Sequence, residues 1–213
     1  MDLSILTQLN VLIQLMCVII VAAYILSRTR IFPEILDNRA TLSTKIILVL
    51  LFGALSVYGS VSGIEFMGSM VNVRDLGPML AGLLAGPWVG IGAGLIGAAY
   101  RLTMGGMTVY ACSVAAVVAG LFGGLVWLWK KKQFAGTKVA VLLAILMESF
   151  HMALTLLLVT PFDAALTVVV RVYIPMVVAN AAGMYVFCLM VEEFRHERAL
   201  QEEHDTREKS GSQ

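Results

Sequence analysis

Three arginines, Arg74, Arg101 and Arg171, are the residues of this 213-residue sequence whose type and position point most directly to chemistry. The other basic residues form three clusters in polar parts of the chain, whereas these three lie within or beside apolar stretches. An arginine at membrane depth is costly and usually paired, and converging guanidinium groups bind a carboxylate or phosphate through parallel hydrogen bonds. The pattern predicts a site for a small anion.

A structural interpretation of the same arginines stays open at this stage. Arg74 is adjacent to Asp75 and close in sequence to Glu65, and Arg171 is two helical turns after Asp163. These pairs would make the three arginines structural or interfacial charges with no ligand.

Polar residues follow the second arginine, at the start of a predicted helix after Gly105-Gly106: Thr108, Tyr110, Cys112 and Ser113. Free backbone amides and the positive end of the helix dipole favour an anion there. The alternative is that these hydroxyl and thiol groups only allow close helix packing.

Glu148, His151 and Asn180 form a second polar group inside apolar stretches. Glu148 and His151 lie one turn apart on one helix face, so they can reach each other or Asn180. The group is interpreted either as a switch linked to a proton or ligand, or as a buried pair that holds helices in register. Two ligands are too few for a metal site, so no metal and no cofactor is predicted.

The composition places these residues in a membrane. Apolar residues make up 59% of the chain and charged residues 14%, and apolar runs of about 20 residues recur, which is typical of an integral membrane protein with several spans. The three cysteines fall in apolar segments without metal-ligand spacing, so no disulfide framework is expected. No nucleic-acid partner is expected.

The predicted architecture is an all-α polytopic bundle of five spans with one broken, re-entrant segment. The spans are Leu9–Ser27, Ile46–Gly63, Met107–Trp129, Val139–Val159 and Ala164–Val191. A short interfacial helix is expected in the polar link after the first span, where Phe32-Pro33 marks a loop.

Orientation follows from the basic clusters, because short basic loops tend to stay in the cytoplasm. If all three clusters lie inside, segment Gly77–Thr103 adds no crossing, and it must enter from the outer face and return to it. Its arms are about 13 Å and 25 Å long as helices, so the second nearly matches the hydrocarbon core. The alternative is six spans, with this segment crossing once. Both arrangements place the C-terminus in the cytoplasm.

Glycines dominate the same segment at three- and four-residue spacings: Gly82, Gly86, Gly90, Gly94 and Gly97. This spacing puts them on one helix face, so most of them are interpreted as sites of tight helix contact.

The ordered motifs resemble a known family, the LytS/YhcK-type five-transmembrane receptor domain. They are NVRDLGP, GLLAGPWVGIGAGLIGAAYR, GG followed by Tyr110 and Cys112, GLFGG, ESFHM and IPMVVANAAG. Domains of this family are the membrane sensors of LytS-type histidine kinases and of some diguanylate cyclases, and certain members recognise small carboxylates such as pyruvate. The resemblance covers nearly all of the apolar chain.

The resemblance implies a ligand pocket formed by Arg74 and Arg101 with Cys112 and Ser113. Asn72 and Thr108 complete the candidate ligand contacts, and Arg171, Glu148, His151 and Asn180 are secondary candidates.

The expected organisation is a sensor domain over residues 1–191 and a cytoplasmic helical stalk over 192–213, whose last four residues look disordered. No kinase or cyclase motif is present, so no catalysis by this chain is expected.

The leading hypothesis is a receptor in the bacterial inner membrane, which acts as a homodimer and signals through the last helix to a cytoplasmic kinase or cyclase domain. The alternative is a transporter, or the substrate-binding membrane subunit of one, for a small anion.

Overall fold

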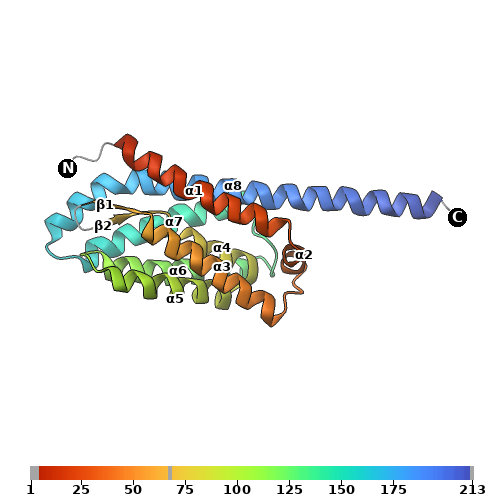
Figure 1. Ribbon diagram of the computed structural model, residues 1–213, viewed down its shortest axis with the longest axis horizontal. Helices are drawn as coiled ribbons and strands as arrows, with labels where there is room; N and C mark the ends of the chain where they lie inside the picture. Colours follow the sequence, from red (N-terminus) through yellow and green to blue (C-terminus); the bar gives the residue numbers. More distant parts are fainter. Residues whose placement is uncertain (1–4, 67–68, 212–213) are drawn as a thin grey trace.

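The computed structural model describes residues 5–66 and 69–211, which form a helical bundle with one short hairpin (Figure 1). In chain order the elements are α1 (Ile5–Ser27), α2 (Ile31–Leu36), α3 (Leu42–Val61), β1 (Ile64–Phe66), β2 (Ser69–Val71), α4 (Leu76–Ala85), α5 (Pro87–Met104), α6 (Val109–Trp129), α7 (Thr137–Leu158) and α8 (Phe162–Gly211). The all-α class and the short helix after the first span are confirmed. The antiparallel hairpin, which pairs Ile64 with Val71, was not predicted.

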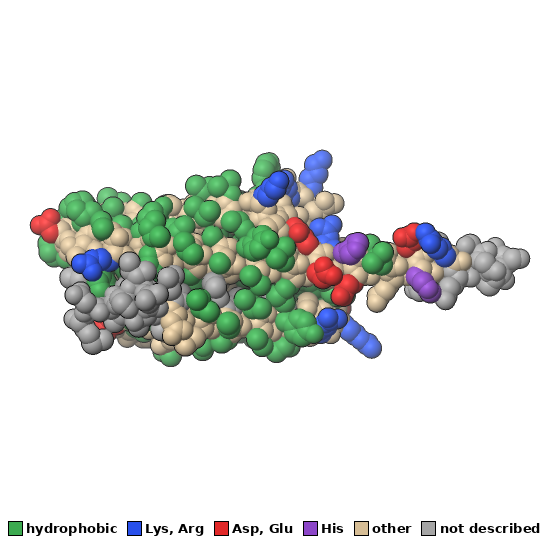
Figure 2. Space-filling model, turned by 90° about the horizontal axis from the view of Figure 1, so that it is seen from above, with side chains coloured by type: hydrophobic (Ala, Val, Ile, Leu, Met, Phe, Trp, Pro, Cys, Tyr) green, Lys and Arg blue, Asp and Glu red, His purple; other side chains and the backbone are tan. Residues whose placement is uncertain are grey.

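Long apolar helices make up the body of the molecule. Among the described residues, α3, α6, α7 and α8 are long and apolar enough to cross a membrane. Apolar side chains cover most of the described part of the visible face of the body in Figure 2, while most of the charged side chains gather at the end from which a helix projects, and along that helix. Such a surface matches a hydrocarbon environment around the bundle.

The bundle has two distinct ends (Figure 1). We call the end with β1–β2 and the loop after α5 the hairpin end, and the end with α2 and the loop between α6 and α7 the basic end. Helices α1, α6 and α8 run from the hairpin end to the basic end, and α3 and α7 run in the opposite direction. The described part of the chain therefore starts and finishes at opposite ends, as five spans require.

Helices α4 and α5 form the predicted re-entrant segment, because the chain turns back between them (Figure 1). Gly86 makes this turn with a φ of 93°, a left-handed conformation that favours glycine, and Pro87 begins α5. The six-span alternative, with one helix across this segment, is therefore wrong for this structure.

The turn between α4 and α5 lies deeper in the bundle than a first arm of about 13 Å predicts. Leu84 and Ala85 line a cavity of about 120 Å³ together with Lys45 and Lys132, so the turn reaches the basic end. The short α4 can reach it because the buried, non-helical segment 72–75 covers the first part of the path.

Glycine contacts pack this segment against α6, as predicted. A Cβ atom at Gly82 or Gly90 would collide with the backbone of Gly120, and one at Gly94 would lie 2.7 Å from the Ala116 carbonyl oxygen. The backbones of α4, α5 and α6 therefore touch with no side chain between them.

Helix α8 continues well beyond the bundle (Figure 1). We call residues 192–211 of this helix the stalk. The helix includes Ser210 and Gly211, two of the four residues expected to be disordered, and the other two, Ser212 and Gln213, lie outside the described residues.

Candidate functional site: buried arginines and a carboxylate–histidine network

Arg74 is positioned by the short segment between β2 and α4. The Asn72 side-chain oxygen accepts a hydrogen bond from the Arg74 backbone N–H at 3.0 Å. Gly59 of α3 allows close approach, since a Cβ there would lie 2.9 Å from the Arg74 Cα. This local turn directs a fully buried arginine side chain into the bundle.

The Arg74 guanidinium has one charged and one neutral partner. Its Nε donates to Asp75 Oδ1 at 3.2 Å, and its Nη2 donates to the Cys112 carbonyl oxygen at 3.0 Å. Its Nη1 has no hydrogen-bond partner among the described residues. The pairing with Asp75 confirms the structural interpretation in part, but one buried donor is left over.

Arg101, in the last turn of α5, is also buried. Its Nη1 donates to the Gly105 carbonyl oxygen and its Nη2 to Thr108 Oγ1 at 3.3 Å. The Thr108 hydroxyl in turn donates to Ser69 Oγ at 3.3 Å. Within the described residues, Arg101 Nε has no partner, so this arginine too keeps a free donor.

The start of α6 contacts both arginines. Arg101 bonds Thr108, and Arg74 bonds Cys112, which is one turn further along the same helix face. Two buried guanidinium groups with a free N–H each therefore approach one helix terminus, where the helix dipole also favours negative charge.

A second network begins at Asp75 and crosses to α7 and α8. Asp75 Oδ2 lies 3.2 Å from His151 Nδ1, and Glu148 Oε1 lies 3.3 Å from the same nitrogen. Asn180 Nδ2 donates to Glu148 Oε2 at 2.9 Å and to the Met176 carbonyl oxygen at 2.9 Å. All four side chains are buried, so the predicted contact among Glu148, His151 and Asn180 is present.

Cys112 joins the two networks. Its carbonyl oxygen bonds Arg74, and its Sγ lies 3.3 Å from His151 Nε2. The sequence placed Cys112 near the arginines, but no pattern linked it to His151, which is 39 residues away. Asp75 was interpreted only as a counter-ion of Arg74, and its contact with His151 was missed.

Two other candidates lie apart from this centre. The Ser113 hydroxyl donates to backbone oxygens of Val109 and Ala98, and the residue lines an apolar groove of about 440 Å³ between α5 and α6. Arg171 is exposed on α8 and is not among the buried arginines. The structure thus groups Arg74, Arg101, Thr108 and Cys112, with Asn72 as a backbone support.

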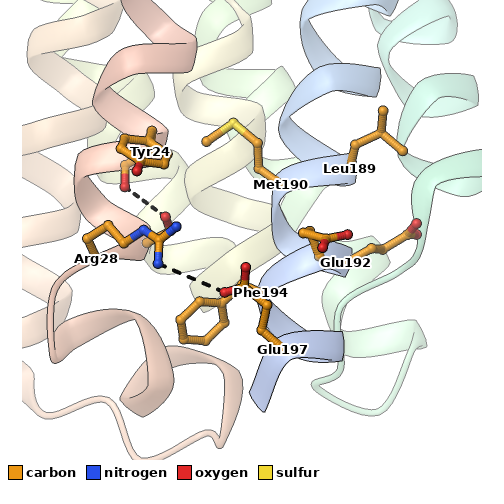
Figure 3. A pocket seen from close by; sticks show the side chains of 9 residues that line it. Tyr24, Arg28, Leu189, Met190, Glu192, Phe194 and Glu197 are labelled. Carbon is orange, nitrogen blue, oxygen red and sulfur yellow. Dashed lines mark hydrogen bonds and ion pairs between the residues drawn. The ribbon is translucent and has the colours of Figure 1, made fainter. Parts of the chain in front are cut away.

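A cavity of about 470 Å³ lies away from the buried arginines, between the last turn of α1 and α8 near the basic end (Figure 3). Arg28 of the segment after α1 lines this cavity. Its Nη1 lies 3.9 Å from a carboxylate oxygen of Glu197, and its Cζ lies 5.2 Å from the ring centre of Tyr24. We interpret this cavity as part of the junction between the bundle and the stalk.

Further contacts hold α8 at the same junction. The Glu192 carboxylate accepts from the Thr137 backbone N–H at 3.1 Å and from its hydroxyl at 2.7 Å, at the start of α7. Phe194 packs edge-on against Phe32 of α2, with ring centres 5.0 Å apart. Asp37, just after α2, accepts from Arg198 Nη1 and Nη2 at 3.0 Å and 2.9 Å. Elements α2 and α7 therefore both hold α8 where it leaves the bundle.

Known proteins similar to this chain are sensor proteins. The chain is 30% identical over 193 residues to the sensor protein LytS of Bacillus subtilis, which covers 82% of this chain and 32% of that protein. It is 32% identical over 181 residues to the sensor histidine kinase BtsS of Escherichia coli K12, which covers 83% and 32%. It is 29% identical over 216 residues to LytS of Oceanobacillus iheyensis, which covers 90% and 36%. The chain thus spans about a third of the length of these relatives.

No solved structure matches the chain. The model of the family described as 5TMR of 5TMR-LYT matches residues 29–194. This range holds both networks, the whole of α3, α6 and α7, and α8 as far as residue 194, whereas α1 lies before it. The chain therefore belongs to this family and is a LytS-type five-transmembrane receptor domain.

Proposed function

We propose that the chain binds a small carboxylate, such as pyruvate, between Arg74 and Arg101 and passes the binding event through α8 to a cytoplasmic histidine kinase domain. The observation that carries the proposal is the pair of buried guanidinium groups at the start of α6, each with an unused N–H donor. A carboxylate has two acceptor oxygens and one negative charge, so it can accept from both groups.

The contacts around Arg74 supply a physical route to the signalling helix. Asp75, next to Arg74, contacts His151 of α7, and Glu148 of α7 contacts Asn180 of α8. A ligand that repositions Arg74 therefore acts on a charged network that ends on α8. The ligand shifts the equilibrium only by its preference for one state, typically about 1 to 3 kcal/mol.

Binding of pyruvate to the purified chain in detergent, measured by titration calorimetry, tests this function. Arg101→Gln is the sharpest variant, because the partners of Arg101 in the described structure are neutral oxygens. We expect it to weaken binding at least about tenfold, which is the loss of one charge-assisted hydrogen bond. Arg171→Gln, which removes an exposed arginine, is the matched control and should bind as the parent does.

Equal binding by the parent and Arg101→Gln would overturn the pocket, and so would the absence of binding by pyruvate and other small carboxylates. The transporter hypothesis is tested separately in proteoliposomes. A receptor binds pyruvate without moving it across the bilayer, whereas net uptake would favour transport.

The proposed assembly is a homodimer joined to an output domain beyond the stalk. In a chain that carries this output domain, pyruvate should change autophosphorylation, and Arg101→Gln should abolish that response. If pyruvate still changed autophosphorylation in Arg101→Gln, signalling would not depend on this pocket.

A further inference from the structure

Three buried side chains of the second network present their ligand atoms to one another. They are Asp75, before α4, and Glu148 and His151, both on α7, and one atom from each lies within 4.8 Å of the others. Such a grouping of two carboxylates and an imidazole is a common donor set for divalent transition metals. The proposed anion pocket uses Arg74 and Arg101 and takes no ligand contact from these three atoms.

The distances suit a shared ion. Asp75 Oδ2 and Glu148 Oε1 lie 3.2 Å and 3.3 Å from His151 Nδ1. A metal about 2.1 Å from each donor places neighbouring donors about 3.0 to 3.4 Å apart in octahedral or tetrahedral geometry. An ion would also draw the two carboxylates together, because its charge cancels their repulsion.

Two of the three atoms lack any other partner. Glu148 Oε1 and His151 Nδ1 are buried, and among the described residues neither forms a well-directed hydrogen bond, although His151 Nδ1 lies close to both carboxylate oxygens. An unsatisfied buried polar atom is costly, so two that lie this close favour a cation bound to both of them.

Each of the three side chains has a second polar atom that does not face the proposed ion, and each of these atoms contacts a different residue. Arg74 Nε donates to Asp75 Oδ1, and Asn180 Nδ2 donates to Glu148 Oε2. His151 Nε2 lies 3.3 Å from Cys112 Sγ, and a metal on Nδ1 requires the ring proton to be on this Nε2, with the sulfur as its acceptor. Metal ligands are typically oriented by outer partners of this kind.

We propose that Asp75, Glu148 and His151 bind one divalent first-row transition-metal ion, with Zn²⁺ as the ion to test first. Two carboxylates neutralise the ion, and the imidazole supplies the nitrogen donor that Zn²⁺ favours. Three protein ligands leave at least one coordination position open. The site does not rest on the carboxylate pocket, and its test uses no organic ligand.

The test measures metal on the full chain, purified in detergent through a tag without histidines. Elemental analysis should find about one metal ion per chain. After chelation, added Zn²⁺ should raise the unfolding temperature, and Co²⁺ should give visible absorption bands that differ from those of the free ion.

Metal binding by variants tests which residues hold the ion. Glu148→Gln and His151→Gln should abolish binding, whereas His196→Gln, which removes an exposed histidine of the stalk, should bind as the parent does. Asn180→Ala should weaken affinity about 10- to 100-fold, as expected for loss of an outer partner.

Two outcomes would overturn the site. In the first, the parent chain carries no metal and shows no Zn²⁺ shift and no Co²⁺ bands, a result that needs no variant to fold. In the second, both α7 variants retain the metal, which would place it elsewhere.

Discussion

Arg74 and Arg101 are both buried, but they differ in what balances their charge. Arg74 bonds the Asp75 carboxylate, whereas the hydrogen-bond partners of Arg101 are the Gly105 carbonyl and the Thr108 hydroxyl. Removing one partner of a buried ion pair strands the other charge, which usually costs about 3 to 5 kcal/mol. The two arginines should therefore differ in their effect on stability.

Arg74→Ala should lower the unfolding temperature much more than Arg101→Ala, because it leaves the buried Asp75 carboxylate without its guanidinium partner and within 4.8 Å of Glu148. Thermal unfolding of both variants in the same detergent measures the difference. The double variant Arg74→Met with Asp75→Asn should recover part of the loss, since it strands no charge. Equal losses for the two single variants would contradict this account.

The sequence could predict which polar residues lie buried in the candidate site better than it could predict their contacts. Arg74 and Arg101 were identified because charge is unusual in apolar segments, and Cys112 because it lies at the start of the predicted helix after Gly105-Gly106 and in a motif of the family. Arg171 was grouped with them because it also lies in an apolar stretch outside the basic clusters, but the structure shows it exposed on α8. The contact between Asp75 and His151 depends on how α7 packs beside the segment before α4, and no local pattern encodes that packing.

At the scale of the elements, glycine contacts hold α4 and α5 against α6. The Gly82, Gly90 and Gly120 backbones meet directly, so even one methyl group has no space there. The three- and four-residue spacing was enough to predict this contact, because it follows from helix geometry alone. The depth of the turn could not be predicted, since it depends on the non-helical start of the segment.

Gly90→Ala should destabilise the bundle by about 1 to 3 kcal/mol, the usual cost of overpacking. The added Cβ would collide with the Gly120 carbonyl group, which is backbone and cannot rotate away. Ala99→Val, on the exposed face of the same helix, is the control and should leave the unfolding temperature nearly unchanged. A stable Gly90→Ala variant would show that α5 and α6 are further apart than described.

The contact between the stalk and α2 gives a prediction about pH. Hydrogen bonds from Arg198 hold the pKa of Asp37 below its ordinary value, against a smaller opposing effect of burial. A lowered pKa in the folded state gives stability that is present above the ordinary pKa of about 3.9 and is lost as pH falls through the folded value. This contact should therefore persist unchanged from about pH 5 to pH 8.

A spin label at Gln201→Cys, in a Cys17→Ser background, reports stalk mobility at this contact. Mobility should be constant over that pH range and should rise in Asp37→Asn, while global stability changes by about 1 kcal/mol or less, as for other exposed pairs. Asp163→Asn, at the opposite end of α8, is the matched control. If the mobility of the label rose between pH 8 and pH 5, a group other than Asp37 would control the contact between the stalk and α2.

At the scale of the whole molecule, the path of the chain determines which ends of the helices share a membrane face. The hairpin and the loop after α5 lie at one end, and the loop between α6 and α7 lies at the other (Figure 1). The basic residues Lys130, Lys131 and Lys132 belong to the second end, which the positive-inside rule places in the cytoplasm. The rule was sufficient to predict five spans and a returning segment, because charge placement depends on position along the chain and not on side-chain packing.

Single cysteines at exposed positions in a Cys17→Ser background test this arrangement. Glu65→Cys, after the start of the hairpin, and Thr103→Cys, at the end of α5, should both react with an impermeant maleimide added outside intact cells. Gln133→Cys should react only after permeabilisation. The Cys17→Ser chain without an added cysteine supplies the background, because Cys112 and Cys188 are buried. If Glu65→Cys and Thr103→Cys were labelled from opposite sides, α4 and α5 together would cross the membrane once, and the segment that carries Arg74 and Arg101 could not place both arginines beside the same turn of α6.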